Sequence, residues 1–264
     1  MNRFKGLIFL ALIVAGIVFL VNSCSNDTYP RPSAAFYLND FAGALSGAAE
    51  LYIVGEGEDL YEDTMDYEDG GAQIVVATFL LEEGQTAADY DRTEIFRQWK
   101  IGKNDMGILI LLLYEEGDLS PELVDAQIEA GYHIEGYAFA YDLDATLDEA
   151  DLFEPDIGSF ETEKRIMQVY FTVLEGLYRD AYDTELIWDL EDYDIDYDTY
   201  YSYSSTDTEL PMDLIAYIFS PYLDWGSKIG YVAVTLLGIG LMGGFARTLG
   251  GGGSSGGFGF RRRR

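Results

Sequence analysis

Charge divides this chain of 264 residues into three parts. All 47 Asp and Glu residues lie between residues 25 and 228, together with nine of the 16 basic residues, so this central part carries a formal net charge of −38. Each acid-free end holds an apolar run, namely Leu7–Val21 after Arg3 and Lys5, and Ile229–Ala246 before Arg247. We therefore expect the ends to meet a membrane and the central part to face water.

The N-terminal run predicts either a cleaved signal peptide or a membrane anchor over residues 1–24, because a basic start precedes an apolar middle. Cys24, the only cysteine, follows Ser23 directly after this run. The arrangement resembles a lipoprotein processing site, where the cysteine is acylated, although Asn22 departs from the usual small or apolar residue. The alternative is an uncleaved helix followed by an unmodified thiol.

The C-terminal run predicts one transmembrane helix over residues 229–246, at the lower length limit for a hydrocarbon core of ~30 Å. The alternative is a buried helix of a soluble protein, which the five glycines of the run disfavour. The positive-inside rule places both basic ends in the cytoplasm. The predicted location is therefore the cell membrane, with residues 25–228 extracytoplasmic and the Gly/Ser-rich tail with its Arg cluster (247–264) cytoplasmic.

Composition excludes several functions. One cysteine and one histidine rule out a disulfide framework and a Cys- or His-rich metal site. The acidity argues against nucleic acid as a partner, because nucleic-acid binding needs basic patches. Carboxylate and other oxygen ligands remain available for chemistry.

The central part divides into a spacer, a domain and a stalk. Residues 25–35 are polar with two prolines, and residues 186–228 begin as low-complexity Asp/Tyr/Ser sequence typical of an acidic stalk. Residues 36–185 predict an α/β domain with a small sheet flanked by helices. The predicted strands are 73–81, 107–114 and an edge-like 125–131; the predicted helices are 46–65, one ending before residue 102, and 162–182; Thr86 and Asp89 have capping-box spacing.

Five segments of this domain together resemble the TPM domain family. The segments are Asn39–Ser46, Gln73–Val76, Trp99–Gly102, Asn104–Leu109 and Gly131–Gly136. They are similar, in this order, to the family's "D-x-A-G-x-L-S" opening, first strand, "W-x-I-G" and "D-N-G-V-L" block, and "G-x-G-L-E-G" element. Two residues depart from the pattern: Met106 replaces a polar residue, and His133 stands where glycine is common.

The resemblance implies an extracytoplasmic α/β sandwich, associated in the family with calcium binding and in some members with weak acid-phosphatase activity. The predicted ligands of a divalent cation, Ca²⁺ in the first place, are the carboxylates of Asp40, Asp105, Glu135 and Asp144, which fall near loops at a sheet rim. Ca²⁺ takes six to eight oxygens and needs neither His nor Cys. The alternative is that Asp40 and Asp105 cap a helix or fix a turn. His133 is interpreted as structural or solvent-exposed.

Three functions follow from these observations. The leading hypothesis is a membrane-tethered, extracytoplasmic module that binds a divalent cation and acts as an accessory or interaction protein with envelope partners, rather than as an enzyme. The alternative is a metal-assisted weak acid phosphatase that uses Asp40 and Asp105. The third is a stalked structural protein without a ligand.

Overall fold

The structure is a computed structural model that describes residues 28–68, 70–154 and 157–186, together with residues 210–213, 216–217, 220 and 228. The chain divides into two compact units, residues 29–217 and residues 1–28 with 218–264, and every element named below lies in the first. The predicted signal or anchor with Cys24, the predicted transmembrane helix and the predicted tail lie outside the described residues. Among the helices of the described part, none combines the length and the apolar composition that crossing a bilayer requires.

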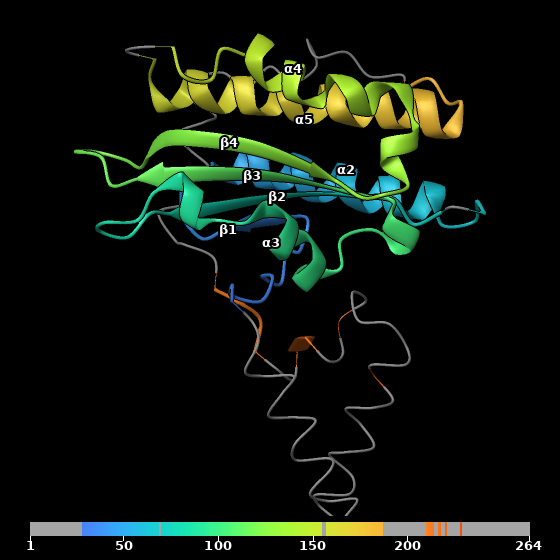
Figure 1. Cartoon of the computed structure of the whole chain (residues 1–264), viewed down its shortest axis with the longest axis horizontal. Helices are drawn as coiled ribbons and strands as arrows, with labels where there is room; N and C mark the ends of the chain where they lie inside the picture. Colours follow the sequence, from blue (N-terminus) through green and yellow to red (C-terminus); the bar gives the residue numbers. More distant parts are fainter. Residues whose placement is uncertain are drawn as a thin grey trace, which may run out of the picture. The chain divides into compact units, whose positions relative to one another are not determined.

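The centre of the domain is a sheet of four strands in the order β1-β2-β3-β4 (Figure 1). β1 (Leu38–Asp40), β2 (Gln73–Leu80) and β3 (Gly107–Glu115) are parallel. β4 (Glu122–Ala130) follows β3 through a hairpin and pairs with it antiparallel. The three predicted strands are therefore confirmed, and the predicted edge strand is the outer strand of the sheet.

Helices cover both faces of this sheet. α2 (Gly47–Thr64) packs on β1 and β2 and contacts α5 (Ser159–Tyr182), whose Tyr170 hydroxyl donates to the Ile53 carbonyl oxygen of α2. α4 (Leu143–Glu149) packs on α5 and β4. The predicted helices over 46–65 and 162–182 are confirmed. In α5 the apolar residues at helical spacing are all buried, which is the pattern expected of a helix with one face on the core.

α3 (Arg92–Trp99) covers the opposite face of the sheet from α5 (Figure 1). Beside it, aromatic rings gather around Phe79 of β2, with centroid distances of 5.3 Å to Phe41, 5.3 Å to Tyr90 and 6.4 Å to Trp99. Because both faces are covered, β3 is buried from Gly107 to Tyr114. This double cover explains why its sequence is a continuous apolar run rather than an alternating one.

Several short elements were not predicted. They are β1, α4 and four 3₁₀ helices: η1 (Ala87–Asp89), η2 (Lys103–Asp105), η3 (Ile134–Gly136) and η4 (Ala138–Asp142). The capping box of Thr86 and Asp89 is confirmed, but it starts η1. α3 begins separately, after the N-cap residue Asp91. A three-residue strand or helix is too short to leave a periodic pattern.

The chain enters and leaves the domain at one place. Met212 donates its N–H to the carbonyl oxygen of Pro32 at 2.9 Å. Ser33 and Pro211 form an isolated antiparallel bridge beside it. The two ends of the described domain are thus joined by a short backbone clasp.

Candidate functional site

Asp40, the first predicted ligand, ends β1 and is only 7% exposed. Its Oδ1 accepts hydrogen bonds from Thr78 Oγ1 at 2.5 Å and from the Ala44 N–H at 3.0 Å. Its Oδ2 accepts from the Leu45 N–H at 3.0 Å. The carboxylate therefore joins β1 to β2 and fixes the loop that leads into α2.

A second buried carboxylate, Glu163 of α5, continues this network. Its Oε2 accepts from the Ser46 N–H and its Oε1 from the Ser46 hydroxyl, both at 2.6 Å. Ser46 is also the N-cap of α2, since its hydroxyl oxygen accepts from the Ala49 N–H. We call Asp40, Ser46, Thr78 and Glu163 the carboxylate network.

Burial sets the protonation of the network. It raises the pKa of Asp40 above the usual value, against the lowering effect of the bonds from Thr78, Leu45 and Ala44. Burial likewise raises the pKa of Glu163, against the bonds from Ser46, and the nearby Asp40 charge raises it further. All four carboxylate oxygens already accept protein donors. A cation at Asp40 would have to displace those donors, so the network fits a structural role.

Asp105, the second predicted ligand, lies in a loop of unusual backbone conformation between α3 and β3. Lys100, Asn104 and Asp105 have φ values of 55°, 56° and 60°, in the left-handed region, and Gly102 lies at 77°. Asn and Asp tolerate this region better than other residues with a side chain, yet it still costs free energy. Backbone strain of this kind is concentrated at functional sites in proteins, so the loop is a candidate site.

The end of β4 holds this loop in place. Nδ1–H of His133 donates to the carbonyl oxygen of Asn104 at 3.0 Å. A Cβ atom added at Gly131 would lie 2.1 Å from the carbonyl oxygen of Asp105, so only glycine fits there. The Glu135 N–H in turn donates to the Gly131 carbonyl oxygen. Asp105 and Glu135 thus lie at the same rim, which we call the Asp105 rim.

The predicted ligands do not form one cluster. Asp40 pairs with Thr78, which pairs with Leu112, whereas Asp105 precedes Gly107, five residues before Leu112 in β3. Five residues of strand span about 17 Å, so Asp40 and Asp105 lie at opposite ends of the sheet.

Asp144 lies elsewhere, in the first turn of α4. Within the described residues, no group of three or more His, Cys, Asp or Glu side chains is placed to hold a metal ion.

The two departures from the family pattern have structural explanations. Met106 is fully buried and belongs to the core. His133 has φ −70° and ψ −37°, a conformation that does not require glycine. The interpretation of His133 as structural or solvent-exposed agrees with the structure, in which the side chain is exposed and bonds to Asn104, so that it helps to position the loop.

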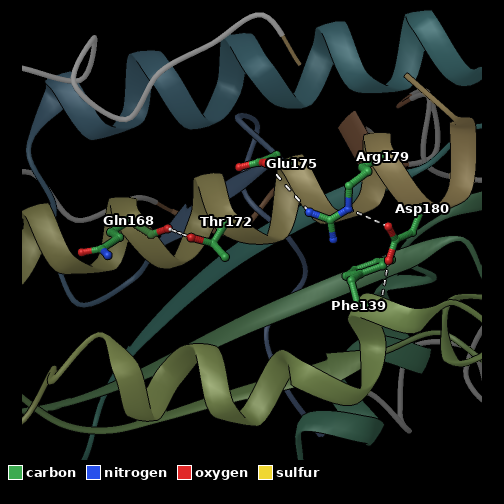
Figure 2. Close-up of polar contacts among 6 residues, drawn as sticks. All are labelled: Phe139, Gln168, Thr172, Glu175, Arg179 and Asp180. Carbon is green, nitrogen blue, oxygen red and sulfur yellow. Dashed lines mark hydrogen bonds and ion pairs between the residues drawn. The ribbon is translucent and has the colours of Figure 1, made fainter. Parts of the chain in front are cut away.

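A third polar group lies on α5 and fixes the segment after the Asp105 rim (Figure 2). Oδ2 of Asp180 accepts from the Phe139 N–H at 2.9 Å, at the start of η4, and Oδ1 accepts from Arg179 Nε at 2.7 Å. Arg179 also pairs with Glu175 at 3.8 Å. The bond from Arg179 lowers the pKa of Asp180, so this carboxylate stays ionised at neutral pH.

Comparison with known proteins finds one family model that matches part of this α/β domain. Residues 38–153 match the family model of the TPM domain, which confirms the resemblance over that part of the chain. The solution NMR structure of the N-terminal domain of a protein from P. gingivalis is also similar, with 19% identity and a TM-score of 0.42, covering 59% of this chain and 90% of that chain. No curated protein matches the chain.

Sequence reasoning did not find Ser46, Thr78 or Glu163 as members of a site. Glu163 is 117 residues from Ser46 and is one of many acids in the chain, so nothing local marks it. The one available signal was its place on the helix, three residues before the buried Ile166 and four before the buried Met167. An acid on an apolar helical face is either paired or functional.

Proposed function

We propose that the chain is a membrane-tethered, extracytoplasmic TPM-domain module that binds a divalent cation, Ca²⁺ in the first place, at the Asp105 rim. The observation that carries the proposal is the strained loop at residues 100–105, whose exposed Asp105 lies at the same rim as the exposed Glu135. Membrane tethering is supported by the two acid-free apolar ends of the chain. In this role the module acts by binding envelope partners rather than by catalysis.

The residues of the rim fit a hard cation only in part. Asp105 and Glu135 supply carboxylate oxygens, and both side chains are exposed. Ca²⁺ tolerates mixed and flexible oxygen ligands, so water would complete its six to eight contacts. We therefore expect weak binding, in the millimolar range typical of extracellular calcium modules.

Asp40 takes no part in this site. Its oxygens are occupied by Thr78, Ala44 and Leu45, and replacing those donors would free the loop before α2. His133 positions the loop through Asn104 rather than binding the cation.

Calorimetric titration of the full chain with Ca²⁺, repeated with Mg²⁺ at matched ionic strength, tests the proposal. We expect one saturable Ca²⁺ site that Asp105→Asn removes and Glu135→Gln weakens. Asp118→Asn is the matched control, because it removes the same charge from the exposed hairpin loop between β3 and β4. Identical titrations of Asp105→Asn and Asp118→Asn would contradict the site. They would show that Ca²⁺ only screens the formal net charge of −31 on the chain.

An assay of phosphomonoester hydrolysis distinguishes the phosphatase alternative from the binding module. The module hypothesis expects no hydrolysis of a simple phosphomonoester, such as p-nitrophenyl phosphate, by the full chain with Ca²⁺ or Mg²⁺. Hydrolysis that Asp105→Asn abolishes and Asp118→Asn leaves unchanged would replace the binding hypothesis by the enzymatic one.

A further inference from the structure

β4 leaves one long edge of the sheet open. It pairs with β3 on one side only, since it is the last strand in the sheet order (Figure 1). β3 is buried from Gly107 to Tyr114, whereas β4 is at least partly exposed at every residue except Ile128. Within the described part of the chain, no backbone hydrogen bond reaches the outer side of β4. An unpaired strand edge is a template for a further strand.

The pairing register shows which backbone groups are available. The Gly131 N–H donates to the Gly107 carbonyl oxygen, and these residues continue the β3–β4 register. In an antiparallel pair, the backbone N–H and C=O groups of every second residue bond to the partner strand. The same groups of the residues in between point away from that strand. The N–H and C=O groups of Ala126, Ile128 and Ala130 therefore face outward.

A shift in the pairing register between Leu113 and Tyr114 limits the regular edge near the start of β4. Asp125 pairs with Leu113 and Leu123 with Tyr114, so Val124 is an extra residue in β4. A bulge of this kind bends the strand and interrupts pairing. The regular edge is thus residues 125–130.

On the side of α3 this edge carries two carboxylates, and Arg92 is paired with one of them. Asp125, Gln127 and Glu129 alternate on the side of α3, where Thr93 and Arg92 bond to Glu129. The other face carries the small Ala126 and Ala130 around the buried Ile128. No basic residue occurs between residues 122 and 130.

We propose that residues 125–130 of β4 bind an extended segment of a partner protein by strand addition, and that this segment carries Lys or Arg at every second position with apolar residues between. Opposite charges on directly paired residues stabilise such a strand, and alternate side chains set its specificity. A second copy of β4 is the poorer fit, because it carries no Lys or Arg to place opposite Asp125. The proposal goes beyond cation binding and uses a different surface from the Asp105 rim.

Peptide binding to the full chain in detergent micelles tests this proposal. The probe is a nine-residue peptide of alternating Lys and Val, with an alternating Glu and Val peptide and a Lys/Val peptide of the same composition in blocks as comparisons. We expect the alternating basic peptide to bind best. Hydrogen exchange should slow at the amides of Ala126, Ile128 and Ala130 and change little at those of Gln127 and Glu129.

A charge-swap variant separates strand addition from attraction to an acidic surface. In Asp125→Lys/Gln127→Lys, two cross-strand pairs become repulsive, so the Lys/Val peptide should bind about tenfold more weakly and the Glu/Val peptide more tightly. Asp118→Asn/Glu116→Gln, which removes two charges from the adjacent hairpin loop, should leave both affinities nearly unchanged.

A backbone control completes the test. A Lys/Val peptide that is N-methylated at alternate amides keeps its charge but loses the donors of one edge, and it should fail to bind in one of the two methylation patterns. Asp105→Asn should bind the parent peptide normally, which separates this proposal from the cation site. Equal binding of the alternating, block and N-methylated peptides, or binding without protection of the three outward amides, would overturn it, as would a dimer that forms through β4.

Discussion

The residue that most directly links burial to charge in this domain is Glu163. It is only 2% exposed, and both of its oxygens are bonded to Ser46, the N-cap residue of α2. Through this contact, α5 holds the start of α2 and the loop that Asp40 fixes from the other side. Burial raises the pKa of both carboxyl groups. The network is therefore a local structure whose free energy depends on pH.

Glu163→Gln should make stability less dependent on pH. In the unfolded chain Glu163 ionises near its ordinary pKa of 4.5, whereas the folded carboxyl group holds its proton to a higher pH. Its contribution is fully present below the ordinary pKa and is lost as the pH rises through the raised one. We expect the variant to lose about 1–3 kcal/mol, because one Ser46 donor loses its acceptor. Its Tm should also fall less than that of the parent between about pH 4 and pH 7.

Thermal unfolding monitored by circular dichroism across this range measures both effects. Glu161→Gln, an exposed acid on the same helix, is the control and should keep the parental pH profile. A Glu163→Gln profile parallel to that of the parent would contradict the argument, because it would show that folding does not raise the pKa of Glu163.

At the scale of an element, α2 contains two glycines with different explanations. A Cβ at Gly57 would lie 2.6 Å from the ring of Tyr37, which is itself buried, so the helix can approach Tyr37 only through glycine. A Cβ at Gly55 would meet nothing within 4 Å. One glycine is therefore a packing requirement, while the other only weakens the helix.

This difference predicts opposite effects of the same substitution. Gly55→Ala should stabilise the domain by about 0.5–1 kcal/mol, the gain in helix propensity. Gly57→Ala should destabilise it by about 1–3 kcal/mol, because Tyr37 must move. Urea unfolding of the two variants measures both values, and destabilisation of equal size in both would contradict the packing argument.

The elements also show what the sequence does and does not predict. β2 and β3 follow from their apolar runs and α5 from its helical spacing, because each is long enough to repeat its pattern. Asp40 was expected in a loop, but it ends β1, a strand of three residues. Asp40 and Asp105 were expected at one rim. They lie apart because β1, β2 and β3 are parallel. The apolar pattern of a strand does not show whether it runs parallel to its neighbours. The partner of Ser46 comes from a helix far along the chain, so it depends on tertiary structure alone.

At the scale of the whole molecule, charge opposes folding. The chain has a formal net charge of −31, and nine basic residues lie among the 47 acids of its central part. Ion pairs such as Arg92–Glu129 at 3.2 Å are partly exposed, and such pairs contribute little. Packing on both faces of the sheet must therefore supply most of the stability, against repulsion between like charges.

Salt should stabilise the domain. Raising NaCl from about 0.02 M to about 0.5 M shortens the screening length from roughly 20 Å to roughly 4 Å, which weakens the repulsion among the acids. We expect Tm to rise by a few degrees in calorimetry at pH 7. The rise should shrink near pH 4, where many acids are protonated. A Tm that falls with added NaCl at pH 7 would show that ion pairs dominate instead.

The clasp between residues 32–33 and 211–212 has a mechanical consequence. Because the chain enters and leaves the domain at one place, a force that pulls the two ends apart acts first on the Met212–Pro32 hydrogen bond and the Ser33–Pro211 bridge. These few bonds would open one after another, before the load reaches the β1–β2 pairing. If the protein is pulled from both ends, the clasp would thus open first, while the sheet, the helices and the open edge of β4 kept their shape.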